Sequence, residues 1–261
     1  MLDTNADHLR DLWKPLGLAK GMTVLCHSFL PSLGRLITAP SVVVETLVER
    51  LGEDGVLVAP TFTYSYFRQQ VYDVERSPST VGVLGDLVRA WPSAVRSLDP
   101  NFSMAAIGNR AESFMRRETI HSFGSGSIYE KLMQADLRIL LLGVDYTALP
   151  LFMHLEKLRG VSYRYDKLFT GVTRSRGSSF ADSAIHYVRD LDTNPTSHRM
   201  RVGALIDVEP DCVRRQFRYG EHRVVPASTV ARVVAEQLAK DPSSLIKEPV
   251  GQEPMGQRLH G

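Results

Sequence analysis

Runs of apolar residues alternate with amphipathic stretches along most of the chain. Short apolar runs predict buried strands at residues 22–27, 55–62, 103–108 and 137–145. Apolar residues at helical spacing predict helices at residues 41–52, 79–91, 127–134, 149–160 and 227–241. Strands that alternate with helices are typical of a layered α/β fold. We therefore expect a central mixed sheet flanked by helices.

The pattern becomes less regular after the helix at 149–160. The segment "SAIHYVRDL" (residues 183–191) lies in this region and is expected to be irregular. No internal repeat and no linker-like stretch divides the chain, so we predict one domain over residues 1–246. The Pro- and Gly-rich residues 247–261 are expected to form a flexible tail.

Composition narrows the class of protein. The 261 residues are 43% hydrophobic and 23% charged, with a net charge of +2, which gives no sign of a nucleic-acid-binding surface. The two cysteines, Cys26 and Cys212, favour a reducing compartment over a disulfide framework. The acidic start "MLDTNADHLRDLW" is unlike a signal peptide, and no apolar run approaches the ~18 residues of a membrane span. A cytoplasmic protein without a membrane segment is expected.

Small polar residues follow three of the predicted strands. These segments are "HSFLPSLG", "PTFTYSYF" and "DYTALP". Because ligands in open α/β sheets bind beyond the carboxyl ends of the strands, one site could gather all three. The first segment, His27–Gly34, could cradle a phosphate with backbone N–H groups, or it could be an ordinary strand–loop–helix connection.

The histidines and cysteines limit the possible chemistry. His154 lies on a predicted helix with Glu156 two residues on, a spacing at which helical side chains do not face each other. His121 lies in a Ser/Gly-rich segment before another helix. No histidine pair has metal-binding spacing, so no metal is expected. Cys26 and His27 are adjacent on a strand and point to opposite faces, which disfavours a cysteine nucleophile.

Several motifs together resemble those of the aminoglycoside 3-N-acetyltransferase family. They are "HS-x-L-x-S-L-G" from His27, "SPS-x-x-G" from Ser77, and "R-S-x-x-P-x-x-S-x-A-A-x-G" from Arg96. The resemblance extends over about residues 5–245. It implies an α/β fold of this family and an enzyme that moves an acetyl group directly from acetyl-CoA to an amine, without a metal.

The resemblance also implies roles for particular residues. His154 matches the family's general base, Glu156 would tune it, and His121 could serve instead. The following residues would contact the coenzyme: Ser28, Leu30, Leu33, Gly34, Thr61, Phe62, Thr63 and Ser103.

The chain departs from the family's motifs at two places. The family usually shows His-x-x-Glu on the histidine's helix, whereas this chain reads Met153-His154-Leu155-Glu156. The third motif often has a histidine before its proline, where this chain has Asp99. Either the helix is locally shifted, or His154 is not the family's histidine.

The acceptor amine is left open by the sequence. An amino sugar or a similar small amine is the leading expectation. Several arginines follow Tyr163 and favour an anionic acceptor, or else form a solvated face: Arg164, Arg174, Arg176, Arg189, Arg199 and Arg201. The alternatives are an aminoglycoside 3-N-acetyltransferase that confers antibiotic resistance and a coenzyme A-binding homologue without catalysis. A homodimer is an open option.

Overall fold

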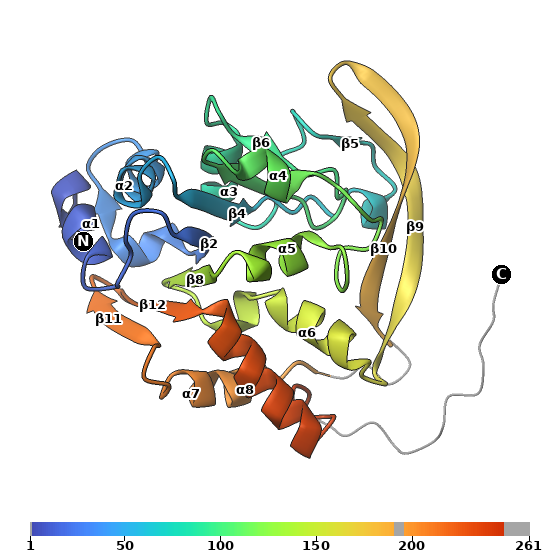
Figure 1. Ribbon diagram of the computed structural model, residues 1–261. Helices are drawn as coiled ribbons and strands as arrows, with labels where there is room; N and C mark the ends of the chain where they lie inside the picture. Colours follow the sequence, from blue (N-terminus) through green and yellow to red (C-terminus); the bar gives the residue numbers. More distant parts are fainter. Residues whose placement is uncertain (1, 191–195, 248–261) are drawn as a thin grey trace.

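A seven-stranded sheet runs through the computed structural model, which describes residues 2–190 and 196–247 (Figure 1). In spatial order its strands are β11 (Val213–Phe217), β12 (Gly220–Pro226), β8 (Leu137–Leu142), β2 (Thr23–Ser28), β4 (Val56–Pro60), β7 (Met104–Ile107) and β6 (Val95–Arg96). The central strands β8, β2 and β4 are parallel, and the outer pairings are antiparallel. The predicted mixed sheet is thus confirmed, and all four predicted strands belong to it.

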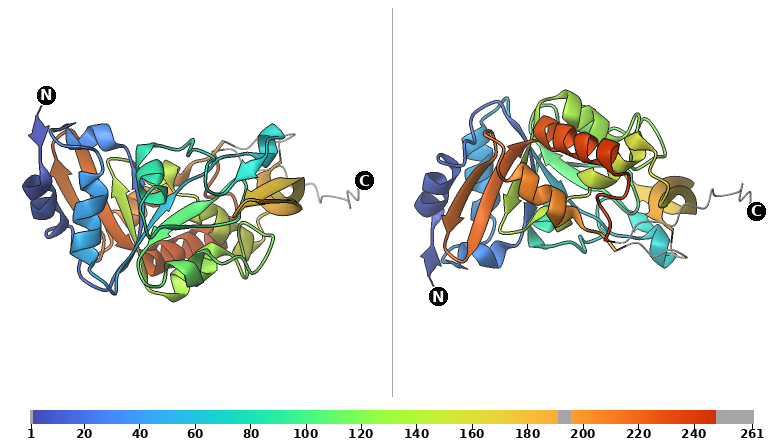
Figure 2. Two further views of the ribbon diagram at one scale, coloured as in Figure 1. Left: turned by 90° about the horizontal axis from the view of Figure 1, so that it is seen from above. Right: turned by 90° about the horizontal axis from the view of Figure 1, so that it is seen from below.

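Helices cover both faces of this sheet, as the two end-on views show (Figure 2). Alternate side chains of β2 enter different cores: Val24 and Cys26 pack with one set of helices, and Leu25 with the other. The first set is α1 (Ala6–Trp13), α2 (Val42–Leu51) and α3 (Val83–Arg89). The second is α4 (Ala111–Met115), α5 (Ile128–Gln134), α6 (Leu151–Arg159), α7 (Arg199–Ile206) and α8 (Ala227–Lys240). The chain therefore forms a three-layer α/β domain.

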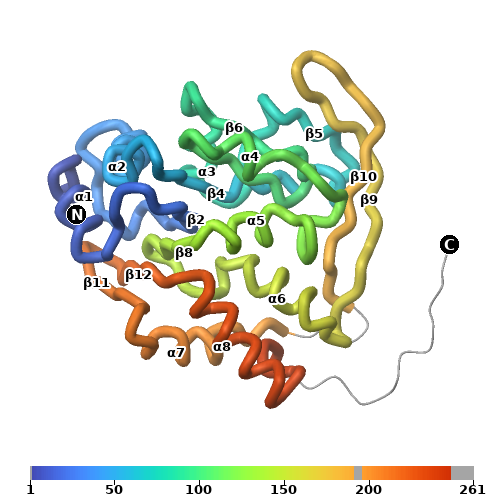
Figure 3. The backbone as a smooth tube through the Cα atoms, viewed as in Figure 1, coloured from blue at the N-terminus to red at the C-terminus, as the bar shows by residue number. Residues whose placement is uncertain are grey.

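A long hairpin was missed by the sequence analysis. β9 (Arg164–Ser175) and β10 (Ser178–Arg189) pair along their full length, and the short β5 (Tyr72–Asp73) joins β9. The expectation of an irregular "SAIHYVRDL" segment is therefore wrong for residues 183–189. Arg176 and Gly177 form the turn with positive φ values of 50° and 77°, as a tight hairpin requires. In the backbone trace the hairpin lies across the molecule from α1 (Figure 3).

Short elements complete the chain near the predicted ligand loop. The 3₁₀ helix η1 (Leu30–Leu33) follows β2, and β3 (Arg35–Leu36) then pairs with β1 (Asp3–Thr4). Two more 3₁₀ helices, η2 (Tyr66–Arg68) and η3 (Tyr146–Ala148), follow β4 and β8. Of the predicted tail, residues 248–261 lie outside the described part of the chain.

Candidate active site

A cleft of about 320 Å³ opens at the carboxyl ends of the three parallel strands. Ser28 ends β2, Pro60 ends β4, and Val144 follows β8, and all three line the cleft. The three small polar segments noted in the sequence thus meet at one place, as parallel strands with a common edge require. The size is that of a pocket for a small molecule or part of a cofactor.

Two helix starts form the walls of the cleft. Leu84 and Gly85, in the first turn of α3, face it from one side, and Pro150 and Met153 at the start of α6 face it from the other. A side chain on Gly85 would place its Cβ 2.2 Å from the carbonyl oxygen of Pro60. Glycine therefore lets α3 approach the end of β4 closely.

The "SPS-x-x-G" motif forms a loop held against the end of β4. Both the backbone N–H and the hydroxyl of Thr80 donate to the carbonyl oxygen of Phe62, at 2.8 and 2.9 Å. The N–H of Ser79 donates to Asp86 of α3. These bonds fix Val81 at the cleft, where it lies with Phe62 among the lining residues.

Two of the eight predicted coenzyme residues, Ser28 and Phe62, line the cleft. Beside them, the hydroxyl of Ser103 donates to the carbonyl oxygen of Thr61 at 2.6 Å, and Arg96 also binds Thr61. The hydroxyl of Thr63 donates to the carbonyl oxygen of Pro100. These buried hydroxyls hold the end of β4 in place.

The remaining three predicted coenzyme residues lie in and after η1. Leu33 is fully buried and Leu30 packs against the same core. Gly34 has φ +83°, and a Cβ there would lie 2.4 Å from the carbonyl oxygen of Leu2. Glycine at this position is therefore required by the close approach of the N-terminal strand.

His154 is buried on α6 and its ring is held from the preceding loop. Its Nδ1 accepts a hydrogen bond from the N–H of Gly124 at 3.1 Å, and the Ser127 hydroxyl lies 3.4 Å away. Burial lowers the pKa of His154 to about 4, and the charge of Glu130 opposes this shift. The ring is therefore neutral near pH 7.

Glu156 forms a buried ion pair away from that ring. Its Oε2 lies 2.8 Å from Nε of Arg164, although neither atom has a partner of good hydrogen-bond geometry. Its Oε1 accepts a hydrogen bond from the Tyr163 hydroxyl at 2.9 Å. In the described part of the chain, no hydrogen bond joins Glu156 to His154.

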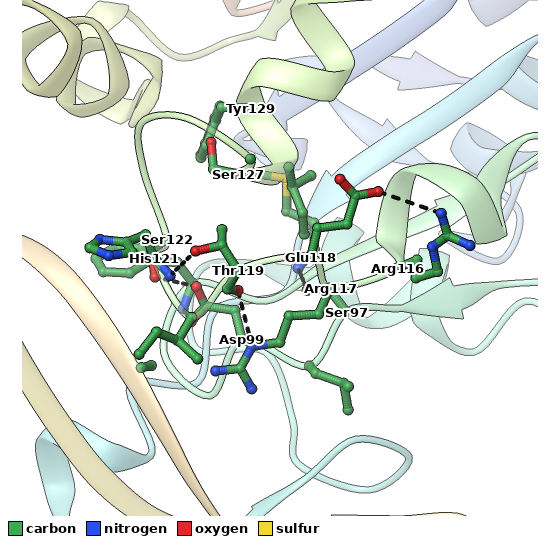
Figure 4. A pocket seen from close by; sticks show the side chains of 17 residues that line it. Ser97, Asp99, Arg116, Arg117, Glu118, Thr119, His121, Ser122, Ser127 and Tyr129 are labelled. Atoms are coloured by element: carbon green, nitrogen blue, oxygen red, sulfur yellow. Dashed lines mark hydrogen bonds and ion pairs between the residues drawn. The ribbon is translucent and has the colours of Figure 1, made fainter.

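His121 lies beside a different and much smaller cavity, of about 30 Å³ (Figure 4). Its N–H donates to Thr119, and its backbone pairs with Ile185 of β10. Ser127 and Tyr129 border the same cavity, and Ser127 also lies against His154. His121 thus belongs to the loop that holds His154, and neither histidine is among the residues that line the cleft.

A buried polar network was not found from the sequence. His186 of β10 contacts the Ser122 hydroxyl through Nδ1 at 2.6 Å and the Asn101 amide through Nε2 at 2.7 Å. Ser122 donates in turn to Asp99, the residue noted in the sequence as a departure from the third motif. Burial lowers the pKa of His186, the charge of Asp99 opposes it, and Arg117 adds to it. The network ties the hairpin to the core, and only the unusual Asp99 hinted at it.

Two further polar side chains line the cleft. Burial lowers the pKa of His27 to about 3, and its Nε2 is buried without a hydrogen-bond partner among the described residues. Arg199, at the start of α7, also lines the cleft, and its side chain donates to the carbonyl oxygens of Thr147 and Leu149. The sequence placed Arg199 among six arginines that favour an anionic acceptor, and His27 only as the first residue of the loop segment, so it did not bring these two side chains together.

Neither a metal cluster nor a membrane-spanning helix is found in the described residues. No three His, Cys, Asp or Glu side chains within 2–190 and 196–247 lie close enough to hold a metal ion. Over the same ranges, every helix is too short or too polar to cross a membrane.

Solved structures with the same fold come from aminoglycoside acetyltransferases. One is described as AAC-IIIb binary with CoASH, with a TM-score of 0.80, 20% identity, and coverage of 92% of this chain and 97% of that one. Another, AAC-VIa bound to sisomicin, has a TM-score of 0.82 and 17% identity, and the match covers 92% of this chain and 98% of that one. At these identities the likeness shows the fold.

Curated relatives share part of the sequence. Aminoglycoside N(3)-acetyltransferase III of Pseudomonas aeruginosa is 26% identical in an alignment of 176 residues that covers 60% of this chain and 65% of that protein. The aminoglycoside N(3')-acetyltransferase-like protein YokD of Bacillus subtilis is 29% identical in an alignment of 169 residues that covers 56% of this chain and 62% of that protein. The chain thus spans under two thirds of the length of these relatives. The sequence model of the family described as aminoglycoside 3-N-acetyltransferase matches residues 25–239, and the chain belongs to that family.

Proposed function

We propose that this protein transfers the acetyl group of acetyl-CoA to the amine of an amino sugar or a similar small molecule. The observation that carries the proposal is the cleft at the carboxyl ends of β8, β2 and β4, built by the motifs that the family shares. The domain that does this would comprise residues 1–246. Acetyl-CoA and two unpaired cysteines fit a cytoplasmic site of action.

The reaction is a direct transfer. The neutral amine attacks the thioester carbonyl carbon, a C–N bond forms, and the C–S bond breaks to release the coenzyme A thiolate. The attacking nitrogen gives up one proton, and the thiolate takes one up. Family resemblance supports Ser28 and Phe62, at the cleft, as contacts of the coenzyme.

We propose His154 as the group that takes the proton, with His121 as the alternative. Its neutral ring supports this role, because a protonated ring could not accept a proton. The amine nitrogen becomes far more acidic once it is bonded to the carbonyl carbon, so a weakly basic histidine suits a late proton transfer. Nδ1 would have to release Gly124 before it could act.

Two classes of acceptor amine are each supported by one line of evidence. The sisomicin complex of AAC-VIa and the family name support an aminoglycoside. Arg199 in the cleft supports an acceptor without many positive charges.

Thiol release from acetyl-CoA tests the proposal. The acceptor panel contains sisomicin, glucosamine and nucleotide-linked amino sugars, each with a control lacking the acceptor. Acceptor-dependent release, with an acetylated product by mass spectrometry, is expected. Tight coenzyme A binding without release for any acceptor would favour the non-catalytic alternative.

A further inference from the structure

Arg199 places a cationic side chain in the cleft. It is 8% exposed and belongs to the residues that line the cavity. Its guanidinium lies 5.6 Å from the ring centre of Phe152. Nη1 donates to the carbonyl oxygens of Thr147 and Leu149, at 3.4 and 3.2 Å. The side chain is thus oriented by α6 and the turn before it.

The other edge of this guanidinium has no partner among the described residues. Nε and Nη2 form the fork that binds carboxylates and phosphates with two parallel hydrogen bonds. Neither atom makes a hydrogen bond or ion pair to any residue in 2–190 or 196–247. Neither atom is fully buried, so both keep contact with solvent. The free edge is therefore accessible while the rest of the side chain is packed.

The carboxylate whose charge acts most on Arg199 is already engaged. Burial lowers the pKa of Arg199, the charge of Glu156 opposes this shift, and Arg164 adds to it. Glu156, however, is paired with Arg164 and accepts from Tyr163. The charge of Glu156 acts on both guanidinium groups, but among the described residues its ion pair is with Arg164. A buried cation without a counter-ion is unfavourable, so an anion that binds here is favoured.

The other arginines of this region serve different surfaces. Arg174 pairs with Asp73, and the backbone of Arg176 binds Glu75 near the hairpin turn. Arg201 is exposed on α7. Of the arginines in the described part of the chain, Arg199 is the one that lines the cleft. The six arginines therefore do not form one anion-binding surface.

We propose that Arg199 is an anion-binding residue of the cleft, and that a substrate bound there carries a phosphate or carboxylate group. This inference rests on the proposed function for the identity of the cleft as the substrate site. The anion can belong to coenzyme A or to the acceptor. If it belongs to the acceptor, the acceptor is an amine with an acidic group, and polycationic drugs are disfavoured.

Binding of pyrophosphate by calorimetry tests the anion site without any turnover. Arg199→Met keeps the apolar stem over Phe152, and Arg199→Lys keeps the charge but loses the fork. Arg201→Met is the matched control, two residues away on the same helix and exposed. Arg199→Met is expected to weaken binding at least about tenfold, Arg199→Lys less, and Arg201→Met within about twofold.

Two further arms identify the source of the anion. Coenzyme A is compared with dephospho-coenzyme A, and glucosamine 6-phosphate with glucosamine, in the parent and in each variant. The parent is expected to bind one of these ligands more tightly with its phosphate than without it. If both Arg199 variants lose this difference in affinity, the anion belongs to that ligand. Circular dichroism and thermal unfolding check that each variant is folded, and Arg199→Lys carries the test if Arg199→Met does not fold.

Equal affinities of the parent and the Arg199 variants for pyrophosphate, coenzyme A and the sugar phosphate would overturn the proposal. So would the absence of binding of all three to the parent. Anion binding through Arg199 without thiol release for any acceptor would instead contradict the proposed function and leave the anion site standing.

Discussion

The backbone N–H of Gly124 donates to Nδ1 of His154, over an N–N distance of 3.1 Å. A neutral imidazole that accepts at Nδ1 carries its proton on Nε2. Gly124 has φ +90°, and a Cβ there would lie 3.0 Å from the side chain of Lys157. The loop before α5 therefore sets both the tautomer and the orientation of the ring.

Replacing His154 should impair turnover more than coenzyme binding. His154→Ala is expected to lower turnover by ~10²–10⁴, the usual contribution of a positioned base. His154→Asn retains an acceptor for the N–H of Gly124 and should fold like the parent, yet show the same loss. Thiol release and acetyl-CoA calorimetry are the measurements.

His121→Ala is the control for that experiment. Because the family resemblance assigns the base to His154, and His121 borders a separate small cavity, removal of His121 should leave most of the turnover. Near-normal turnover of His154→Ala would show that His154 is not the general base. A large loss in His121→Ala alone would transfer the role to that residue.

Buried neutral histidines should make stability depend on pH. The pKa of His27 is lowered to about 3 and that of His154 to about 4, whereas both are near 6.5 in the unfolded chain. As pH falls below 6.5, the unfolded state binds protons first, so the free energy of unfolding falls. The slope reaches up to about 1.4 kcal/mol per pH unit for each histidine.

His27→Leu separates one of these contributions. The variant loses a group whose Nε2 has no partner in the described chain, so it should fold. Urea unfolding between pH 7 and pH 5 should show a shallower slope than in the parent. Identical slopes would mean that His27 is not buried in its neutral form.

The pair of Glu156 and Arg164 should matter for stability. Their side chains are 2% and 5% exposed, so removing one charge leaves the other buried and unpaired. Glu156→Gln is expected to lower the free energy of unfolding by ~3–5 kcal/mol. Adding Arg164→Met should restore much of that loss. The measurement is urea unfolding of Glu156→Gln, of Arg164→Met and of the double variant, and additive losses would contradict the coupling.

Narrowing the cleft should weaken the binding of acetyl-CoA. Val81 lines the cleft and is 38% exposed, whereas Val83, 57% exposed, is outside its lining. Val81→Trp is expected to raise the Kd for acetyl-CoA about tenfold or more, and Val83→Trp to leave it nearly unchanged. Equal affinities in calorimetry would place the coenzyme elsewhere.

The sheet was predictable because its central strands are buried on both faces and therefore consist of apolar residues. Strands β2, β4 and β8 are apolar on both sides, and turn residues separate them from amphipathic helices. The hairpin β9–β10 was missed because most of its residues are exposed or half-buried, so no alternation marks it. The dipeptide Arg176–Gly177 was the local signal that could have indicated its turn.

The site was predictable only as far as strand ends reveal it. Ser28 ends β2 and Phe62 lies two residues after β4, so the ends of two buried strands place both at the shared edge of the sheet. The contacts of His154, Glu156 and Arg199 come from segments distant in the sequence, such as Gly124, Arg164 and Thr147. Sequence spacing carries no information on such partners. For the same reason Gly34 looked like a ligand residue, although packing against Leu2 accounts for it.

The pairing of β2 with β8 bears on how the chain is synthesised. Thr23 lies opposite Val56 on one side and Leu137 on the other. At about 5–20 residues per second, a ribosome needs on the order of ten seconds to reach the second partner. Until then one edge of an apolar strand is unpaired, and the nascent chain offers it to chaperones or to neighbouring chains. Slower translation before residue 137 should therefore reduce the yield of folded protein.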